Sequence, residues 1–500
     1  MGHGNADIDK ITPQSTFYDS GRFGRLFPTL PPFSADTPLI RDALHELGAP
    51  RGAMDAQDVL SDPVALLDQP DLSADNPDNP DLTAGMTFLG QFLDHDMTFD
   101  PTSSLARQQD PESLRNFRIP ALDLDSVYGG GPDVSPHLYD QSPERGRGRT
   151  TLLREEIPGS GDVSCGGTVR YDLPRNSQKV ALIGDPRNDE NLIVSQLHLA
   201  MISFHNAVVE DVEEELGPAY TPEEIFTEAQ RIVRWHYHWM ILHEYLPQTI
   251  GPDLADDILQ DGRRFYHWRN HPFIPVEFSV AAFRFGHSQI RPSYRANFGP
   301  DANDLAQHFI GLIFDPDDPA PDDPGDLRGG CRAAKRFIDW QTFFDFSDER
   351  VRNNKMIDTK LSSVLFDLMG MPSGTSRSLA QRNLLRGLAM KLPSGQKVAA
   401  AMQAPSLAKA DLAELQPLHL HKRTPLWYYV LKEAEVVAGG THLGPVGGRI
   451  VGEVIHGLIE GASQSYLTLD PEWTPSYGAD DDFRMVDLLK KAGVVVDLHQ

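Results

Sequence analysis

A long apolar stripe between residues 193 and 212 constrains the fold of this chain more than any other feature. Its members recur every three or four residues, which is the period of one face of an α-helix. They are Ile193, Leu197, Met201, Phe204, Val208 and Val212. Gly217 and Pro218 follow directly, and neither residue continues a helix well. The pattern therefore predicts one long helix that ends at this glycine.

A second helix is predicted directly after the first. Thr221, Pro222 and Glu224 are typical of an N-cap, a first-turn proline and a capping-box glutamate. The apolar pattern continues to Ile241, and we expect Pro247 to end the helix. Alternating strand patterns with hairpin turns are scarce, and no fixed-period repeat is present. We therefore expect a mainly α fold with little β structure, in one large domain.

Two segments rich in proline and aspartate interrupt the helical pattern, at residues 61–82 and 315–330. Proline removes a hydrogen-bond donor and like charges repel compaction, so we expect both segments to be solvated loops. Neither shows the ligand spacing of an EF-hand, which argues against a calcium repeat.

The charge balance limits the possible partners. The 500 residues include 45 Lys+Arg and 72 Asp+Glu, a formal net charge of −27 with His neutral. Such a surface repels phosphate backbones and anionic lipid, so we expect no nucleic acid and no membrane surface as partner. No apolar run approaches the roughly 20 residues of a membrane span, and no signal peptide is visible. A cytoplasmic location and export without a removable signal both fit these observations.

The segment GQFLDHD places an unusual set of polar residues in an apolar stretch. Its apolar spacing predicts a helix, with Thr83 as a plausible N-cap. At about 100° per residue, Gln91, Asp94 and His95 share one sector, and Asp96 points well away from Gln91. Taken alone, a half-exposed helix with a satisfied histidine explains this segment better than a catalytic site does.

Three further segments carry candidate functional residues. In GDPRNDE, which is expected to open the long helix, Arg187 and Glu190 are neighbours on a helical turn. In FRFGH, aromatic residues precede His287, and the glycine would let a large flat ligand approach the backbone; axial ligation of haem iron needs a neutral imidazole in such an apolar slot. In RNLLRG, Asn383 is able to orient a ligand histidine. Taken singly, a surface ion pair, a core histidine and an amphipathic helix are the better explanations.

Together, the order and composition of these motifs resemble the animal-type haem peroxidases of the peroxidase–cyclooxygenase superfamily. The resemblance runs from about residue 22 to about residue 467, and is strongest in GQFLDHD, LDLDSVYGG, GDPRNDEN, AFRFGH and RNLLRG. The compact length and the Pro/Asp loops resemble bacterial members most. The resemblance implies a helical haem peroxidase domain over residues 20–485, an N-terminal extension over residues 1–19 and a C-terminal tail over residues 486–500.

The resemblance also implies the roles of the residues above the haem. His95 matches the distal acid/base, which takes a proton from hydrogen peroxide and returns it to the leaving oxygen. Arg187 matches the catalytic arginine, whose guanidinium stabilises the charge on that oxygen. Gln91 matches the distal glutamine, which holds water or a halide beside the iron. The family's reaction passes through an oxyferryl intermediate that then oxidises small electron donors.

Below the haem, the resemblance makes His287 the proximal iron ligand. Asn383 matches the asparagine that accepts the other ring proton of this histidine. Arg386 matches an arginine near a haem propionate. Asp94 and Glu190 match the carboxylates that form ester links with haem methyl groups, so the implied cofactor is covalently linked haem b.

The resemblance implies calcium as a second cofactor. Its ligands would be Asp96, Asp123 and Asp125, with backbone carbonyls from Ile119 and Ala121. The family usually has a threonine at the position of Ile119, so one hydroxyl ligand is missing here. Asp125 stands where a serine is usual, and we expect its added charge to offset that loss.

Two departures from the family bear on the reaction. Asn191 replaces a methionine that forms a sulfonium link in some relatives, so we expect poor chloride oxidation. Bromide, iodide, thiocyanate or phenols are the expected donors. Arg284 occupies the position of the radical tyrosine of the cyclooxygenases, which disfavours the alternative function of a fatty-acid dioxygenase. A non-catalytic adhesion protein that binds calcium and haem is the other alternative.

Overall fold

The computed structural model describes residues 23–62, 64–99, 116, 118, 120–142, 149–161, 168–268, 271–298, 310–311, 337–368 and 374–495. The predicted loop at residues 315–330 lies outside this part of the chain. Within it, the longer α-helices are α1 (Pro38–Leu47), α3 (Ala84–Met97), α5 (Leu192–Leu216), α6 (Pro222–Met240), α8 (Pro252–Asp261), α10 (Leu379–Ala389), α11 (Gly395–Met402), α12 (Leu426–Val437), α13 (Pro445–Gly461) and α15 (Met485–Lys491). The short ones are α2 (Ala65–Asp68), α4 (Asp125–Tyr128), α7 (Leu246–Ile250), α9 (Val276–Ser279) and α14 (Tyr466–Leu469). Two 3₁₀ helices carry functional candidates, η6 (Pro186–Asp189) and η8 (Ala282–His287).

The β structure of the described residues consists of short two-stranded pairs. The strands are β1 (Phe23–Gly24), β2 (Asp78–Thr83), β3 (Glu155–Glu156), β4 (Tyr171–Asp172), β5 (Ile274–Pro275), β6 (Tyr294–Arg295), β7 (Ile310–Gly311) and β8 (Asn353–Lys355). β1 pairs with β5 in parallel, and the pairs β2–β8, β3–β4 and β6–β7 are antiparallel. The predicted mainly α fold is confirmed.

The prediction that residues 61–82 form a solvated loop is wrong in part. This segment contains α2 and most of β2, and Asn79 and Leu82 of β2 are buried. β8 supplies the backbone partners, with Asp78 opposite Lys355 in the register. Pairing with a distant strand satisfies the backbone, which the local composition does not predict.

The long helix α5 confirms the apolar stripe and its glycine stop. Gly217 ends the helix with φ 74°, a left-handed conformation that favours glycine. The start differs from the prediction, because residues 186–189 form the separate helix η6 and Asn191 caps α5 through Val194 N–H. By length and composition α5 is able to cross a membrane, but 89% of its most apolar window is buried inside the protein. Packing therefore accounts for its apolar surface.

The second predicted helix begins as expected and continues further. Thr221 and Glu224 form a reciprocal capping box at the start of α6. Pro247 does not end the helix, since a π-helical turn, η7 (Ile241–Tyr245), leads from α6 into α7. A π-turn shifts the backbone hydrogen bonds, and Pro247 falls in the first turn of α7, where its missing N–H is tolerated.

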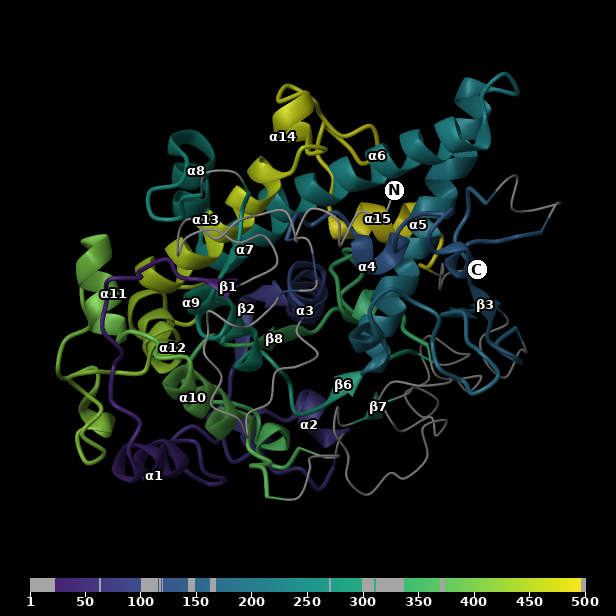
Figure 1. Ribbon diagram of the computed structural model, residues 1–500. Helices are drawn as coiled ribbons and strands as arrows, with labels where there is room; N and C mark the ends of the chain where they lie inside the picture. Colours follow the sequence, from purple (N-terminus) through teal and green to yellow (C-terminus); the bar gives the residue numbers. More distant parts are fainter. Residues whose placement is uncertain are drawn as a thin grey trace.

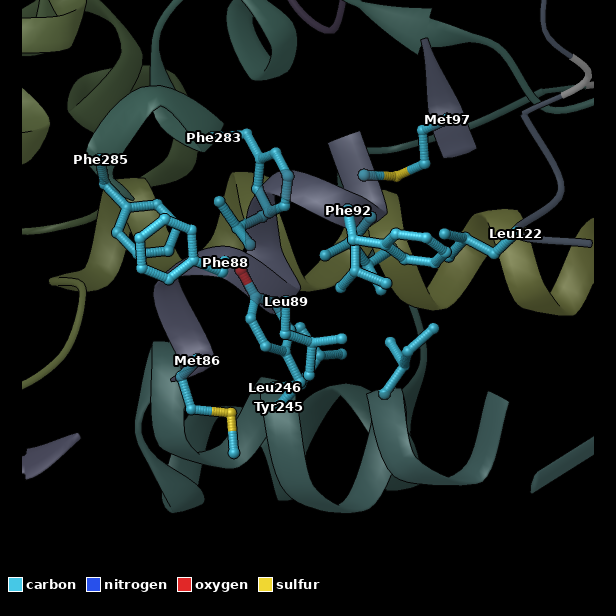
Figure 2. Packing of buried hydrophobic residues seen from close by; sticks show 14 of the residues in the cluster. Met86, Phe88, Leu89, Phe92, Met97, Leu122, Tyr245, Leu246, Phe283 and Phe285 are labelled. Atoms are coloured by element: carbon cyan, nitrogen blue, oxygen red, sulfur yellow. The ribbon is translucent and has the colours of Figure 1, made fainter. Parts of the chain in front are cut away.

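Helix α3 lies near the centre of the molecule (Figure 1). It contacts α5 and also η8, and η8 is backed by α12 and α13. Figure 2 shows Phe283 and Phe285 of η8 beside Phe88 and Leu89 of α3. A Cβ on Gly90 would lie 2.5 Å from the Tyr245 hydroxyl, so a glycine permits the close packing of α3 on η7.

The C-terminal helix α15 belongs to the same core. Leu488 and Leu489 are fully buried, and α15 packs against α5. The predicted boundary between domain and tail at residue 485 therefore falls at the first residue of a packed helix.

Candidate active site and calcium site

Helix α3 and the segment after η6 bring the predicted distal residues together. Gln91 and His95 are one turn apart on α3, and Gln91 Nε2 donates a hydrogen bond to Glu190 Oε1. His95 Nε2 lies 3.7 Å from the same carboxylate oxygen. Asn191 Nδ2 donates to Gln91 Oε1 at 3.3 Å. Two motifs about 100 residues apart in sequence thus share one polar cluster.

The other nitrogen of the His95 ring is fixed from behind. Its Nδ1 lies 2.7 Å from Asn188 Oδ1, and because an amide oxygen accepts, Nδ1 donates. Asn188 Nδ2 in turn lies 2.9 Å from His198 Nδ1 on α5. Asn188 and His198 are fully buried, and His95 is nearly so.

Arg187 is held by Asp185 and by the end of α3. Its Nε and one terminal nitrogen donate to the two Asp185 carboxylate oxygens at 3.1 and 2.8 Å. The same terminal nitrogen donates to the carbonyls of His95 and Thr98. The predicted helical pair of Arg187 with Glu190 is therefore not formed. The 3₁₀ turn and the buried Asp185 carboxylate direct the guanidinium toward α3 instead.

Asp185 also joins the distal arginine to the predicted calcium loop. Arg118 bonds Asp185 Oδ2 at 2.7 Å and Asp125 Oδ1 at 2.9 Å. Burial acts to raise the pKa of Asp185, but Arg187 and Arg118 together lower it to about 2. A Cβ on Gly184 would lie 2.5 Å from the Ser126 carbonyl, so the two segments approach as closely as glycine allows.

Three carboxylates meet at the predicted calcium site. Ligand oxygens of Asp96, Asp123 and Asp125 all lie within 4.8 Å of one another. Burial and the charge of Asp123 raise the pKa of Asp96 to about 7, although the nearby Arg118 charge acts to lower it. Hard oxygen ligands of this kind fit Ca²⁺. Ala121 lies in the same loop, and Ile119 lies outside the described residues.

The backbone of this loop is unusual. Leu122 and Leu124 have φ values of 51° and 62°, and both side chains are fully buried. His238 Nε2 donates to the Leu122 carbonyl at 2.9 Å, and the Tyr237 hydroxyl donates to Asp96 Oδ2 at 3.3 Å. Helix α6 thus supports Leu122, and Asp96 of α3 supports Leu124 by accepting from its backbone N–H at 3.2 Å, so contacts from outside the loop hold a backbone conformation that leucine rarely adopts.

The predicted proximal pair is in contact, with the amide turned the opposite way from the prediction. Asn383 Nδ2 lies 2.7 Å from His287 Nδ1, so in this structure the amide donates to the ring. The reason is Arg284, which donates to Asn383 Oδ1 at 3.0 Å and thereby turns the amide nitrogen toward His287. A neutral ring that accepts at Nδ1 carries its proton on Nε2, so for Nε2 to ligate iron the amide would have to turn over, accept the Nδ1 proton and release Arg284.

The surroundings of His287 suit a neutral ligand and an anionic cofactor. Burial and, to a smaller extent, the Arg284 charge lower the pKa of His287 to about 3, so the ring is neutral at working pH. Burial also lowers the pKa of Arg284, whose hydrogen bonds described here go to the neutral Ser279 carbonyl and Asn383 amide. A half-buried guanidinium whose hydrogen bonds described here go to neutral groups fits a carboxylate such as a haem propionate, in addition to the nearby Asp94 charge.

Two more predicted residues border this region. Asp94 of α3 accepts from the Thr98 hydroxyl at 3.3 Å, and its charge acts to raise the pKa of Arg284 on η8. Arg386 follows Asn383 by one turn on α10 and is half-buried. The residues that would hold haem are thus His287, Arg284, Arg386, Asp94 and Glu190.

Sequence reasoning missed the residues that support the catalytic candidates. Asn188 and Asp185 lie inside the motif GDPRNDE, but nothing in their spacing indicates contacts with His95 and Arg187. Arg118 and His198 come from other segments, and tertiary contacts alone bring them to the site.

The comparisons with known proteins agree with this arrangement. Residues 107–484 match the animal haem peroxidase family. The chain is 31% identical to a peroxidase-like protein of Margaritifera margaritifera over 252 residues, 42% of this chain and 32% of that protein. The fold is similar to peroxidase A from Dictyostelium discoideum, with a TM-score of 0.56, 14% identity, and 96% of this chain and 93% of that chain covered. It is also similar to the fatty acid alpha-dioxygenase of Oryza sativa, with a TM-score of 0.53, 14% identity and coverage of 78% and 70%.

The matched stretches span between 9% and 42% of the curated relatives' lengths. At 14% identity, the two solved structures establish the fold. The family match covers well over half of the residues. This chain therefore belongs to the animal haem peroxidase family, and haem is the cofactor that the family implies.

Proposed function

We propose that this protein is a haem peroxidase that reduces hydrogen peroxide and oxidises small electron donors. The observation that carries the proposal is the cluster of Gln91, His95 and Glu190 on one side and the pair of His287 and Asn383 on the other. Gln91 and His95 lie on α3 and His287 lies on η8, and these two helices pack together, while Glu190 follows η6 and Asn383 comes from α10. Peroxide chemistry needs a base to move the proton and a histidine that would ligate iron, and these are the roles proposed for His95 and His287.

Bound haem would supply the iron that binds and reduces peroxide. His95 moves the proton: its Nδ1 donates to Asn188, which leaves Nε2 to take a proton from one peroxide oxygen and give it to the other. Arg187 is held through Nε and one terminal nitrogen, and its other terminal nitrogen is the one that we propose to contact the bound peroxide. A fixed guanidinium stabilises the negative charge of the departing oxygen without reorganising.

Asp94 and Glu190 are proposed to become ester-linked to haem during turnover with peroxide. Glu190 is 49% exposed along its side chain, and Asp94 lies near the half-buried Arg284. After turnover, acid extraction should leave haem on the protein, and Asp94→Val combined with Glu190→Gln should release it. Free haem from the unmutated protein would refute the ester links.

Calcium is proposed as the second cofactor, bound by the three carboxylates of Asp96, Asp123 and Asp125. The proposed donors are bromide, iodide, thiocyanate and phenols. Chloride should be a poor donor, because Asn191 cannot form a sulfonium link. Its side chain instead caps α5 and donates to Gln91. Chloride oxidation as fast as bromide oxidation would contradict the proposal that chloride is a poor donor.

The experiment is an absorption spectrum of the purified protein, followed by peroxide-dependent oxidation of guaiacol or bromide. His95→Ala should abolish the oxidation and leave haem bound, whereas His137→Ala, at an exposed histidine, should leave both unchanged. Undiminished activity in His95→Ala would overturn the mechanism. Bound haem without any oxidation in the unmutated protein would point to the non-catalytic binding function.

Fatty-acid oxygenation is the second candidate, since the rice dioxygenase shares the fold. Arg284 stands three residues before His287, and its guanidinium is bound to Asn383. A tyrosyl radical is therefore not available at this position. Oxygen uptake with an unsaturated fatty acid, faster than guaiacol oxidation, would favour the dioxygenase.

A further inference from the structure

Three buried side chains form a continuous hydrogen-bonded chain behind the distal site. His95 Nδ1 lies 2.7 Å from Asn188 Oδ1, and Asn188 Nδ2 lies 2.9 Å from His198 Nδ1. His198 Nε2 has no hydrogen-bond partner among the described residues, so the chain ends at this ring. The Phe92 ring stands edge to face with His198, at 6.1 Å between centroids.

This arrangement couples the tautomers of the two histidines. An amide offers an acceptor on one side and a donor on the other. When Asn188 Oδ1 faces His95, the His95 proton is on Nδ1 and Nε2 is bare. If the amide were reversed, Nδ2 would face His95, the ring proton would move to Nε2, and the base would be lost.

The first arrangement requires an uncharged His198. Its bare Nδ1 accepts from Asn188, whereas a charged ring would donate through both nitrogens and force the amide to reverse. Burial lowers the pKa of His198 to about 3, against Asp185 and Asp189, which raise it, while Arg118 lowers it further. The ring is therefore neutral at working pH.

We propose that Asn188 and His198 are positioning residues that hold His95 in the tautomer with a bare Nε2. The proposal rests on the proposed peroxidase function, because the bare nitrogen is needed to take the proton of a ligand bound at the iron. It goes beyond that function because it assigns control of the His95 tautomer to His198, a buried histidine on α5 that would not itself touch the bound ligand.

The test compares two substitutions of His198 in the haem-loaded protein. His198→Phe keeps the ring volume beside Phe92 and removes the acceptor. His198→Asn places a carbonyl oxygen near the position of Nδ1 and loses packing. A purely structural role predicts that Phe is tolerated better than Asn, and the positioning role predicts the opposite order.

The readout is the rate at which hydrogen cyanide binds the ferric protein, since this ligand loses its proton on binding. Carbon monoxide binding to the reduced protein needs no proton transfer and is the control. Because a positioned base contributes about 10²- to 10⁴-fold, we expect His198→Phe to slow cyanide at least about tenfold. Carbon monoxide binding should be unchanged, and His198→Asn should stay within about threefold of the unmutated protein for both ligands.

The proposal would be overturned if His198→Phe slowed the binding of cyanide and of carbon monoxide equally. It would also be overturned if His198→Phe bound cyanide faster than His198→Asn. Unchanged cyanide binding in His198→Phe and in Asn188→Leu would do the same. These outcomes are distinct from failure of the proposed function. A protein that binds haem and cyanide but oxidises no donor fails as a peroxidase, while its cyanide rates still report on the tautomer.

Discussion

Replacing Asp185 by asparagine removes the carboxylate that joins two buried arginines. Asp185 is fully buried and bonds Arg187 at 2.8 Å and Arg118 at 2.7 Å. Arg118 keeps Asp125 as a partner, and Arg187 keeps two backbone carbonyls. An asparagine of the same shape accepts hydrogen bonds but does not compensate two positive charges.

The expected cost follows from the burial and the pKa of this carboxyl. A lowering from 3.8 to about 2 corresponds to about 2 kcal/mol of stabilisation at neutral pH. Removing one partner of a buried ion pair costs about 3 to 5 kcal/mol, because the remaining charges stay buried. We therefore expect Asp185→Asn to lower the free energy of unfolding by about 2 to 5 kcal/mol.

Urea unfolding of the purified protein measures this difference. The matched control is Asp68→Asn, whose carboxylate bonds Arg352 at the same 2.8 Å but is 64% exposed, so the expected loss is below about 1 kcal/mol. The contribution of Asp185 is present above its unfolded pKa and is lost as pH falls through the folded pKa. The difference should therefore be constant between about pH 5 and 8. A loss no larger than that of the control would refute the reasoning.

Three further predictions concern the proximal ligand, calcium and one buried acid. His287→Ala should remove the Soret absorbance, and retention of full absorbance would show that another residue ligates the iron. Asp123→Asn should weaken calcium binding about tenfold or more in a chelator competition, because one of three charged ligands is lost; equal affinity would place the ion elsewhere. Burial raises the pKa of Glu433 from 4.5 to about 7. Its contribution to stability is therefore present below pH 4.5 and lost as the pH rises through 7. The urea midpoint of the unmutated protein should fall over this range, and Glu433→Gln should make that fall smaller.

Several elements of the fold followed from local patterns. The apolar stripe that begins at Ile193 predicted α5, and Thr221 with Glu224 predicted the start of α6. These predictions were possible because helix periodicity and capping depend on residues close in sequence. The sequence also indicated the shared sector of Gln91 and His95, because side chains four apart lie on one face.

Other features depended on partners far away in the chain. β2 pairs with β8 across more than 250 residues, and Arg187 donates to the carbonyls of His95 and Thr98 on the other side of the site rather than to its helical neighbour. The amide of Asn383 is turned by Arg284, about 100 residues away. Hydrogen-bond polarity and charge pairing of this kind depend on three-dimensional neighbours. No sequence spacing encodes those neighbours.

The residue types and their periodicity were thus sufficient to place the helices and to name His95, Arg187 and His287 as functional candidates. Only the folded structure showed the direction of each hydrogen bond and the side chains that hold the candidates in place, such as Asn188 and His198 behind His95. The physical reason is that helical patterns arise from contacts within a turn or two. The state of a buried side chain is set by whichever distant groups the packed core brings within bonding distance.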